Sequence, residues 1–287
     1  MKGLIIKIIS NLYTVSCDGN IYECGARGVL RRLGVSPLVG DIVIFDKDDL
    51  IIKEILPRKN SIIRPPSANI DQAILITSVK EPDLSLNLLD KLLLIMSMNN
   101  IKPIICFTKL DLLDEMDALK LVINYYESLG YTCLTSDQTE KLKNCFKNKI
   151  TVFVGQSGAG KSTLLNKLDS SLDLKTNFIS KALGRGKHTT RHVELINMYG
   201  GSVLDTPGFS LIDLSVYSKE EIRDNFIEFS GHKCQYKDCF HDGESGCTVQ
   251  SEDLIFKSRY HNYLAFLKEV KKNDFRFHTR NKGKKRR

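Results

Sequence analysis

The sequence lacks an apolar run of about 20 residues, the length that a membrane-spanning helix needs. Its first ten residues are rich in Ile and Leu, but Lys7 interrupts them and no small-residue cleavage site follows. This segment is therefore predicted to be a strand and not a secretory signal. With an ordinary hydrophobic content of 42%, the chain is expected to be a cytoplasmic protein that has no membrane partner and is a monomer.

Internal repeats and low-complexity segments are also absent before the basic C-terminal end. A chain of 287 residues is long enough for two or three domains. The patterns described below predict three: an all-β domain over residues 1–64, an α/β domain over 65–217, and a small helical domain over 218–287.

The first domain is predicted to be a five-stranded OB-fold barrel that binds RNA. Asp18-Gly19 is a strong hairpin-turn signal between two of its strands. Arg27, Arg31 and Arg32 lie in a loop that either contacts nucleic acid or simply faces solvent. The expected strands are Gly3–Ser10, Leu12–Cys17, Asn20–Cys24, Asp41–Phe45 and Leu50–Ile55.

The second domain follows a linker marked by Pro57, Pro65 and Pro66. Apolar strands then alternate with helical stretches, which predicts a mostly parallel sheet with helices on both faces. The expected strands are Gln72–Ile76, Pro103–Phe107, Tyr131–Thr135, Ile150–Val154 and Ser202–Leu204, and the expected helices are near Leu86–Met98, near Ala118–Leu129 and from Lys161 to Leu168.

A phosphate loop of the form G-x-x-x-x-G-K-[ST] lies between the strand ending at Val154 and the helix beginning at Lys161. Its glycines let backbone N–H groups point at phosphate oxygens, Lys161 reaches the outer phosphates, and Ser162 offers a hydroxyl to Mg²⁺. A plain glycine turn before a helix is the alternative. The predicted nucleotide contacts are Gly155, Gln156, Ser157, Gly158, Ala159, Gly160, Lys161, Ser162 and Thr163.

Two further sequence motifs follow predicted strands. Asp205-Thr-Pro-Gly208 is typical of P-loop hydrolases, in which the aspartate contacts the Mg²⁺ shell and the glycine N–H meets the terminal phosphate. Thr108, Lys109, Leu110 and Asp111 resemble the guanine-specificity motif Asn-Lys-x-Asp. A carboxylate there accepts two hydrogen bonds from guanine, and adenine lacks those donors. Either string alone could be an ordinary turn.

The order of these strings is unusual, because the guanine motif precedes the phosphate loop. Strand ends of an open parallel sheet converge on one crevice whatever the order of their connections. The match is therefore to a circularly permuted GTPase domain that binds GTP or GDP. Leu134-Thr-Ser136 would supply a second base-contacting segment, with Ser136 as its contact.

The glutamine that orients the attacking water in many GTPases is missing, since Phe209 follows Gly208. His188 is the candidate for this task, although a surface or phosphate-contacting role is equally compatible with its position. Thr190, with Thr189 as the alternative, would join Ser162 in binding Mg²⁺. The predicted catalytic residues are His188, Lys161 and Thr190.

Cys234, Cys239, His241 and Cys247 lie within fourteen residues. Three thiolates and one imidazole suit a closed tetrahedral site, which predicts one structural Zn²⁺. Reduced, unbound thiols are the alternative, and His232 could compete as a ligand. Residues 254–270 are predicted to form a helix packed on this region, and the remaining cysteines to be free thiols.

Residues 268–287 hold ten Lys or Arg and two acidic residues, which accounts for the whole net charge of +8. A concentrated cationic segment indicates a polyanionic partner such as RNA or DNA. A solvated tail that only aids solubility is the alternative.

The motifs together resemble those of the RsgA family, also called YjeQ or EngC. The resemblance rests on Gly155–Thr163, Gly186–His192, Asp205–Phe209, Ser258–Tyr263 and the spacing of the Cys/His residues. It implies GTP hydrolysis, with Mg²⁺, that is stimulated by the small ribosomal subunit and its rRNA during late maturation of that subunit. An RNA-binding module regulated by nucleotide, a P-loop ATPase and a GTPase acting on tRNA or another structured RNA are the competing interpretations.

Overall fold

The computed structural model describes residues 1–28, 36–63, 66–169, 193–205, 213–249 and 256–282. The chain divides into two compact units, each assembled from segments that are far apart in the sequence. The first unit comprises Met1–Asp83, Asn99–Glu115 and Thr132–Phe209. The second comprises Leu84–Met98, Met116–Tyr131 and Ser210–Arg287.

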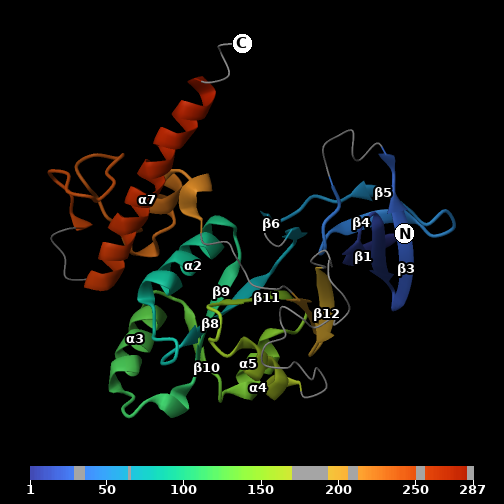
Figure 1. The fold of residues 1–287 in the computed structure, drawn as a ribbon, viewed down its shortest axis with the longest axis horizontal. Coiled ribbons are helices and arrows are strands. Elements are labelled where there is room, and N and C mark those ends of the chain that lie inside the picture. The colour runs from blue at the N-terminus through green and yellow to red at the C-terminus, as the bar shows by residue number, and fades with distance from the viewer. Residues whose placement is uncertain (29–35, 64–65, 170–192, 206–212, 250–255, 283–287) are drawn as a thin grey trace. The chain divides into compact units, whose positions relative to one another are not determined.

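The first unit begins with a five-stranded barrel (Figure 1). Strands β1 to β5 pair in the order β1-β2-β3-β5-β4, β4 closes the barrel against β1, and β3 and β5 run parallel. Asp18 and Gly19 both have positive φ, as a tight hairpin turn requires. The predicted barrel is confirmed. Its strands are β1 Lys2–Ile9, β2 Leu12–Cys17, β3 Asn20–Ala26, β4 Ile42–Asp46 and β5 Ile51–Ile55.

The barrel strands alternate between buried and more exposed residues because one face of each strand points into the barrel. The apolar side chains that fill its interior are Ile5, Tyr13, Val15, Cys17, Cys24, Val43, Phe45 and Ile52. A short antiparallel pair, β6 Ser61–Ile63 and β7 Pro66–Ala68, follows the barrel.

The remainder of the first unit is a parallel sheet with the strand order β10-β9-β8-β11-β13. A further strand, β12, pairs antiparallel with β13 and meets barrel strand β1 at Glu194 and Lys7. The predicted parallel sheet is confirmed. Its strands are β8 Gln72–Ser78, β9 Lys102–Thr108, β10 Thr132–Thr135, β11 Ile150–Gly155, β12 Glu194–Met198 and β13 Gly201–Asp205.

Two helices of the first unit, α4 Thr139–Cys145 and α5 Lys161–Leu168, pack on this sheet. Leu164, Leu165 and Leu168 lie on one side of α5 and are buried against strand residues such as Ile74 and Phe153. Helix α5 begins and ends where the sequence predicts. A 3₁₀ turn, η1 Leu110–Leu112, follows β9.

The second unit is built from helices and irregular chain. Helix α7 (red in Figure 1) contacts α2 and α6. Phe226, Phe229 and Tyr263 meet edge to face or stacked, with ring centroids 4.6 to 5.5 Å apart. The elements are α2 Leu86–Met98, α3 Asp117–Ser128, η3 Leu214–Val216, α6 Lys219–Asp224, η4 Ile227–Phe229 and α7 Lys257–Lys282.

Helix α7 starts later and ends later than the predicted helix over residues 254–270, so the basic segment is helical through Lys282. Helices α4 and α6 and strand β12 were not predicted. Over the described part of the chain, no helix combines the length and apolarity that crossing a membrane takes.

Candidate functional site

The phosphate loop lies at the carboxyl end of β11, where it turns into α5. Gly155 approaches β8 so closely that an added Cβ would lie 2.4 Å from the carbonyl oxygen of Ile76. Gly158 and Gly160 have φ values of +78° and +93°, which L side chains rarely adopt. The backbone itself therefore favours glycine at these three positions.

Lys161 is the first residue of α5, and its ammonium group folds back over the loop. Its Nζ donates to the carbonyl oxygens of Gly155 at 2.7 Å and Gln156 at 3.3 Å. Burial lowers the pKa of Lys161 from its ordinary value. A cation desolvated in this way gains much from a phosphate anion, which suits the role predicted for it. Ser162 follows in the first turn of the helix and is partly buried.

The predicted guanine motif lies at the carboxyl end of β9. Thr108 is buried, and its hydroxyl donates to the carbonyl oxygen of Ala159 in the phosphate loop at 2.6 Å. Lys109 has a left-handed backbone (φ +61°) and donates from Nζ to the carbonyl oxygen of Glu81. Asp111 is exposed in the 3₁₀ turn η1. The fold thus brings the base motif and the phosphate loop to one edge of the sheet.

The predicted second base-contacting segment follows β10, at the same edge of the sheet. Ser136 donates its backbone N–H to the carbonyl oxygen of Phe107 at 2.9 Å, which ties it to β9. Its own carbonyl accepts from Lys167 of α5 at 3.1 Å. The ends of three strands, β9, β10 and β11, therefore lie together at one edge of the sheet.

Other predicted site residues fall outside the described part of the chain. These are His188, Thr189, Thr190 and Gly208, and only the backbone of Asp205 is described, at the end of β13. Strand β13 lies beside β11 and runs parallel to it. Asp205, the last residue of β13, therefore lies at the same edge of the sheet as the phosphate loop.

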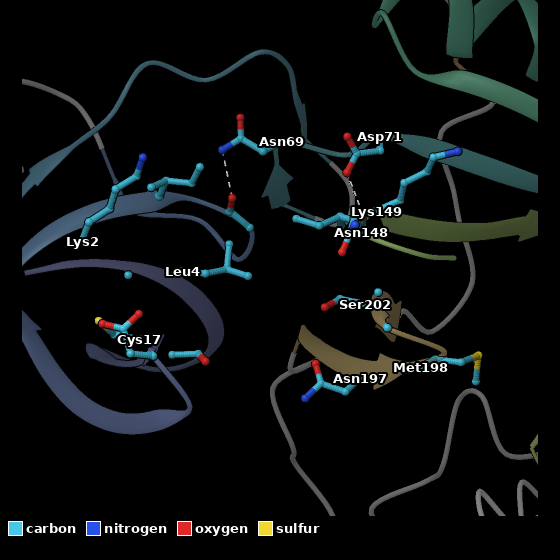
Figure 2. A pocket seen from close by; sticks show the side chains of 18 of the residues that line it. Lys2, Leu4, Cys17, Asn69, Asp71, Asn148, Lys149, Asn197, Met198 and Ser202 are labelled. Carbon is cyan, nitrogen blue, oxygen red and sulfur yellow. Dashed lines mark hydrogen bonds between the residues drawn. The ribbon is translucent and has the colours of Figure 1, made fainter. Parts of the chain in front are cut away.

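A separate cavity of about 1200 Å³ lies at the opposite end of these strands (Figure 2). Asp71, Ile150 and Gly201, which line it, stand at the amino-terminal ends of β8, β11 and β13. Lys2 and Leu4 of the barrel also line it. It is therefore distinct from the edge of the sheet at which the predicted nucleotide motifs lie.

The second unit holds the Cys/His cluster. The ligand atoms of Cys234, Cys239, His241 and Cys247 all lie within 4.8 Å of one another, and His232 is not among them. Each of the three sulfur atoms is 3.5 Å from His241 Nδ1. A tetrahedral zinc with Zn–S near 2.3 Å and Zn–N near 2.0 Å would place sulfur and nitrogen about 3.5 Å apart. The donor set and its spacing thus fit a metal ion.

Hydrogen bonds within the loop around this cluster, and one from α7, hold the loop in place. Glu244 accepts the backbone N–H groups of Phe240 at 2.7 Å and Asp242 at 2.9 Å. Tyr260 of α7 donates its hydroxyl to the carbonyl oxygen of His241 at 2.6 Å. Burial lowers the pKa of His241, which favours the neutral imidazole that metals bind. None of the eight cysteines, all of which lie in the described part of the chain, forms a disulfide.

The second unit holds a buried ionic network that the sequence patterns do not predict. Arg259 of α7 donates from Nη1 to Asp90 of α2 at 2.6 Å and from Nε to Glu228. Tyr126 of α3 also donates to Asp90, at 2.5 Å. Burial lowers the pKa of Arg259, but the two carboxylates outweigh it and raise that pKa above its ordinary value. The network joins α2, α3 and α7.

These features define a P-loop GTPase whose motifs run in circularly permuted order. Comparison with known proteins supports this class over nearly the whole chain. The RsgA GTPase family is matched by residues 55–215 and the RsgA N-terminal domain by residues 2–50. The chain belongs to the RsgA GTPase family.

Two relatives are each called small ribosomal subunit biogenesis GTPase RsgA, the second with the number 2. The Enterococcus faecalis protein is 45% identical over 283 residues, covering 94% of this chain and 95% of the relative. The Oceanobacillus iheyensis protein is 45% identical over 284 residues, covering 94% of this chain and 97% of the relative.

Two solved structures have the same fold. The first is YloQ, described as a circularly permuted GTPase, with a TM-score of 0.79 at 34% identity, covering 94% of this chain and 95% of that one. The second is YjeQ from Thermotoga maritima, with a TM-score of 0.81 at 32% identity, covering 94% and 98%. The permuted order inferred from the motifs is confirmed.

Proposed function

We propose that this chain is a GTPase of small ribosomal subunit biogenesis, which hydrolyses GTP to GDP and phosphate faster when the subunit is bound. The observation that carries the proposal is the hydrogen bond from Thr108 to Ala159, which holds the base motif and the phosphate loop together at one edge of the sheet. The names of relatives that match over nearly the whole chain support the target.

In this proposal, Lys161 binds the outer phosphates and Ser162 binds Mg²⁺ together with Thr190. Asp111 accepts hydrogen bonds from guanine, and Ser136 contacts the base from the other side. Asp205 and Gly208 act on the Mg²⁺ shell and the terminal phosphate, and His188 orients the attacking water.

The domain boundaries proposed are 1–64, 65–217 and 218–287, with the barrel and the basic C-terminal end as rRNA contacts. Electrostatic attraction of this end to phosphates is independent of RNA sequence, so the barrel and the third domain must supply the preference for one site. A monomer working in the cytoplasm, without a membrane partner, fits an assembly factor that binds and leaves a ribosomal subunit.

The ion proposed for the Cys/His cluster is one structural Zn²⁺. Four protein ligands leave no open coordination position, so the ion stabilises the loop and takes no part in hydrolysis. It would fix a segment that has few apolar contacts of its own.

Replacing Cys247 with serine is expected to abolish stoichiometric zinc in the purified protein and to lower the melting temperature of the second unit. The cause is the loss of one thiolate from a closed site. Elemental mass spectrometry and thermal unfolding measure the two effects. Cys133→Ser, at a partly buried cysteine outside the cluster, is the control and should retain one zinc per chain. A wild-type protein without bound metal would contradict the assignment.

Gradient sedimentation with purified ribosomal subunits tests the proposed partner. The protein is expected to migrate with small subunits in the presence of a non-hydrolysable GTP analogue and to be released in GDP. If the protein migrated with large subunits or with tRNA and not with small subunits, the proposed target would be wrong.

A further inference from the structure

Tyr236 lies in the loop of the Cys/His cluster, between the first two cysteines, and is 53% exposed. Across the described ranges, its hydroxyl forms no hydrogen bond, and its ring forms no stacking or cation–π contact. Phe240 of the same loop differs, because Lys219 Nζ and Arg223 Cζ lie 5.7 and 5.2 Å from the centroid of its ring. Tyr236 therefore presents to solvent an aromatic ring that the aromatic packing of the second unit does not use.

The backbone on both sides of Tyr236 is held by the rest of the loop. Gln235 donates its N–H to the carbonyl oxygen of Gly246 at 3.1 Å, and the carbonyl oxygen of Tyr236 accepts the N–H of Cys239 at 3.4 Å. Gly246 has a φ of +75°, and an added Cβ there would lie 2.4 Å from Gln235 Oε1, so the two segments pack closely. A ring on a fixed backbone loses less conformational freedom when a ligand immobilises it.

Two lysines flank this ring in the sequence. Lys233 precedes Tyr236 by three positions and Lys237 follows it directly, and both lysines are exposed. Neither forms an ion pair with a residue that the structure describes. Asp238, also exposed, is the acidic residue nearest to the ring in the sequence. The loop thus combines one flat, partly apolar side chain with two unpaired cations and one anion.

An unpaired nucleotide matches this combination, because it carries a flat base and a negative phosphate. Proteins that bind single strands place cations along the backbone and stack bases on exposed aromatic side chains. In a duplex, neighbouring base pairs cover both faces of each base. An acidic peptide would pair with the lysines but would offer no flat face to the ring, and an apolar protein surface would bury the lysines without partners. The side chains of the loop therefore favour unpaired RNA.

We propose that Tyr236 binds unpaired RNA by stacking on a base, while Lys233 and Lys237 bind the adjacent phosphates. This contact lies in the second unit, whereas the predicted nucleotide motifs lie in the first. The basic C-terminal end of the second unit attracts any phosphate backbone, and Tyr236 adds a preference for strands whose bases are free. The inference rests on the proposed function, in which the partner is an RNA.

The absence of tryptophan from the chain allows a direct test of stacking. In the full-length protein, Tyr236→Trp introduces a single indole at the proposed contact, and a base stacked on an indole quenches its fluorescence. Emission is expected to fall saturably as a short unpaired oligoribonucleotide is added, and to change little with an RNA duplex. Tyr199→Trp is the matched control, since Tyr199 is a 40% exposed tyrosine of the first unit whose ring lies 6.1 Å from that of Phe146. Its emission is expected to stay constant.

Fluorescence anisotropy of a dye-labelled strand separates the ring from the lysines. Tyr236→Ala is expected to weaken binding by about tenfold without changing its salt dependence, because stacking releases no counterions. Lys233→Gln with Lys237→Gln is expected to lower the slope of log affinity against log salt by about 1.4, at about 0.7 for each phosphate contact on a single strand. Lys120→Gln with Lys141→Gln removes the same charge from two exposed positions elsewhere and should leave the slope unchanged.

Constant emission from Tyr236→Trp on addition of the strand would overturn the inference, as would an equal fall for Tyr199→Trp or wild-type affinity in Tyr236→Ala. Equal quenching by duplex RNA would also overturn it, because the contact would then not need a free base. A wild-type protein that failed to bind the free strand would overturn the inference alone. Failure to migrate with small subunits would overturn the proposed target instead, so the two failures can be told apart.

Discussion

Replacing Asp111 with asparagine is expected to weaken GDP binding by about a thousandfold, because the carboxylate is the group proposed to accept both guanine donors. The carboxamide would present an N–H to one of those donors and lose an acceptor. Xanthine carries a carbonyl in place of the guanine amino group, so the variant is expected to bind xanthosine diphosphate more tightly than GDP. Calorimetric titration with the two nucleotides measures both changes.

Asp114→Asn is the control for this variant. Asp114 lies three positions further along the same exposed segment, with a side chain that is 98% exposed and only a distant ion pair to Lys80. The same loss of charge there is expected to leave GDP affinity unchanged. Tight GDP binding by Asp111→Asn, or equal weakening by Asp114→Asn, would remove Asp111 from base recognition.

Replacing Arg259 with methionine is expected to lower the free energy of unfolding by about 3–5 kcal/mol, because two buried carboxylates lose their counter-charge. The side chains of Asp90 and Glu228 are 0% and 3% exposed, so water cannot replace the guanidinium. The guanidinium carbon also lies 4.9 Å from the centroid of the Phe226 ring, so the variant loses this cation–π contact together with the charge and the hydrogen bonds. Urea unfolding measures the change.

Lys120→Met provides the comparison within the same unit. Lys120 pairs with Asp117 across one turn of α3, and both side chains are largely exposed. Surface pairs of this kind contribute little. Adding Asp90→Asn and Glu228→Gln to Arg259→Met should recover part of the loss, since the buried charges are removed. A loss for Arg259→Met no larger than that for Lys120→Met would contradict the role assigned to the network.

Features set by local chemistry could be predicted from the sequence. Alternating apolar residues and the Asp18-Gly19 turn were sufficient to predict the barrel. Its strands begin and end within two residues of the predicted bounds. Helix α5 could be predicted to the residue, because the glycines before Lys161 fix where it begins. The spacing of the Cys/His residues was enough to identify four side chains that lie together.

Features set by distant contacts could not be predicted. Arg259 lies 169 positions from Asp90, and an arginine on a polar helix face is usually solvated, so its pattern gave no sign of burial. The grouping of α2 and α3 with the C-terminal residues depends on the same contacts. Strand β12 was missed, although the alternation before Tyr199-Gly200, a turn with positive φ at both residues, was a usable signal.

The rate of GTP hydrolysis with purified small subunits, large subunits or tRNA tests the central claim most directly. An RsgA-family GTPase built around this permuted crevice should hydrolyse GTP slowly alone and much faster with small subunits, whereas large subunits and tRNA should add little. Equal stimulation of GTP hydrolysis by small subunits, large subunits and tRNA, or stimulation by none of them, would contradict the account.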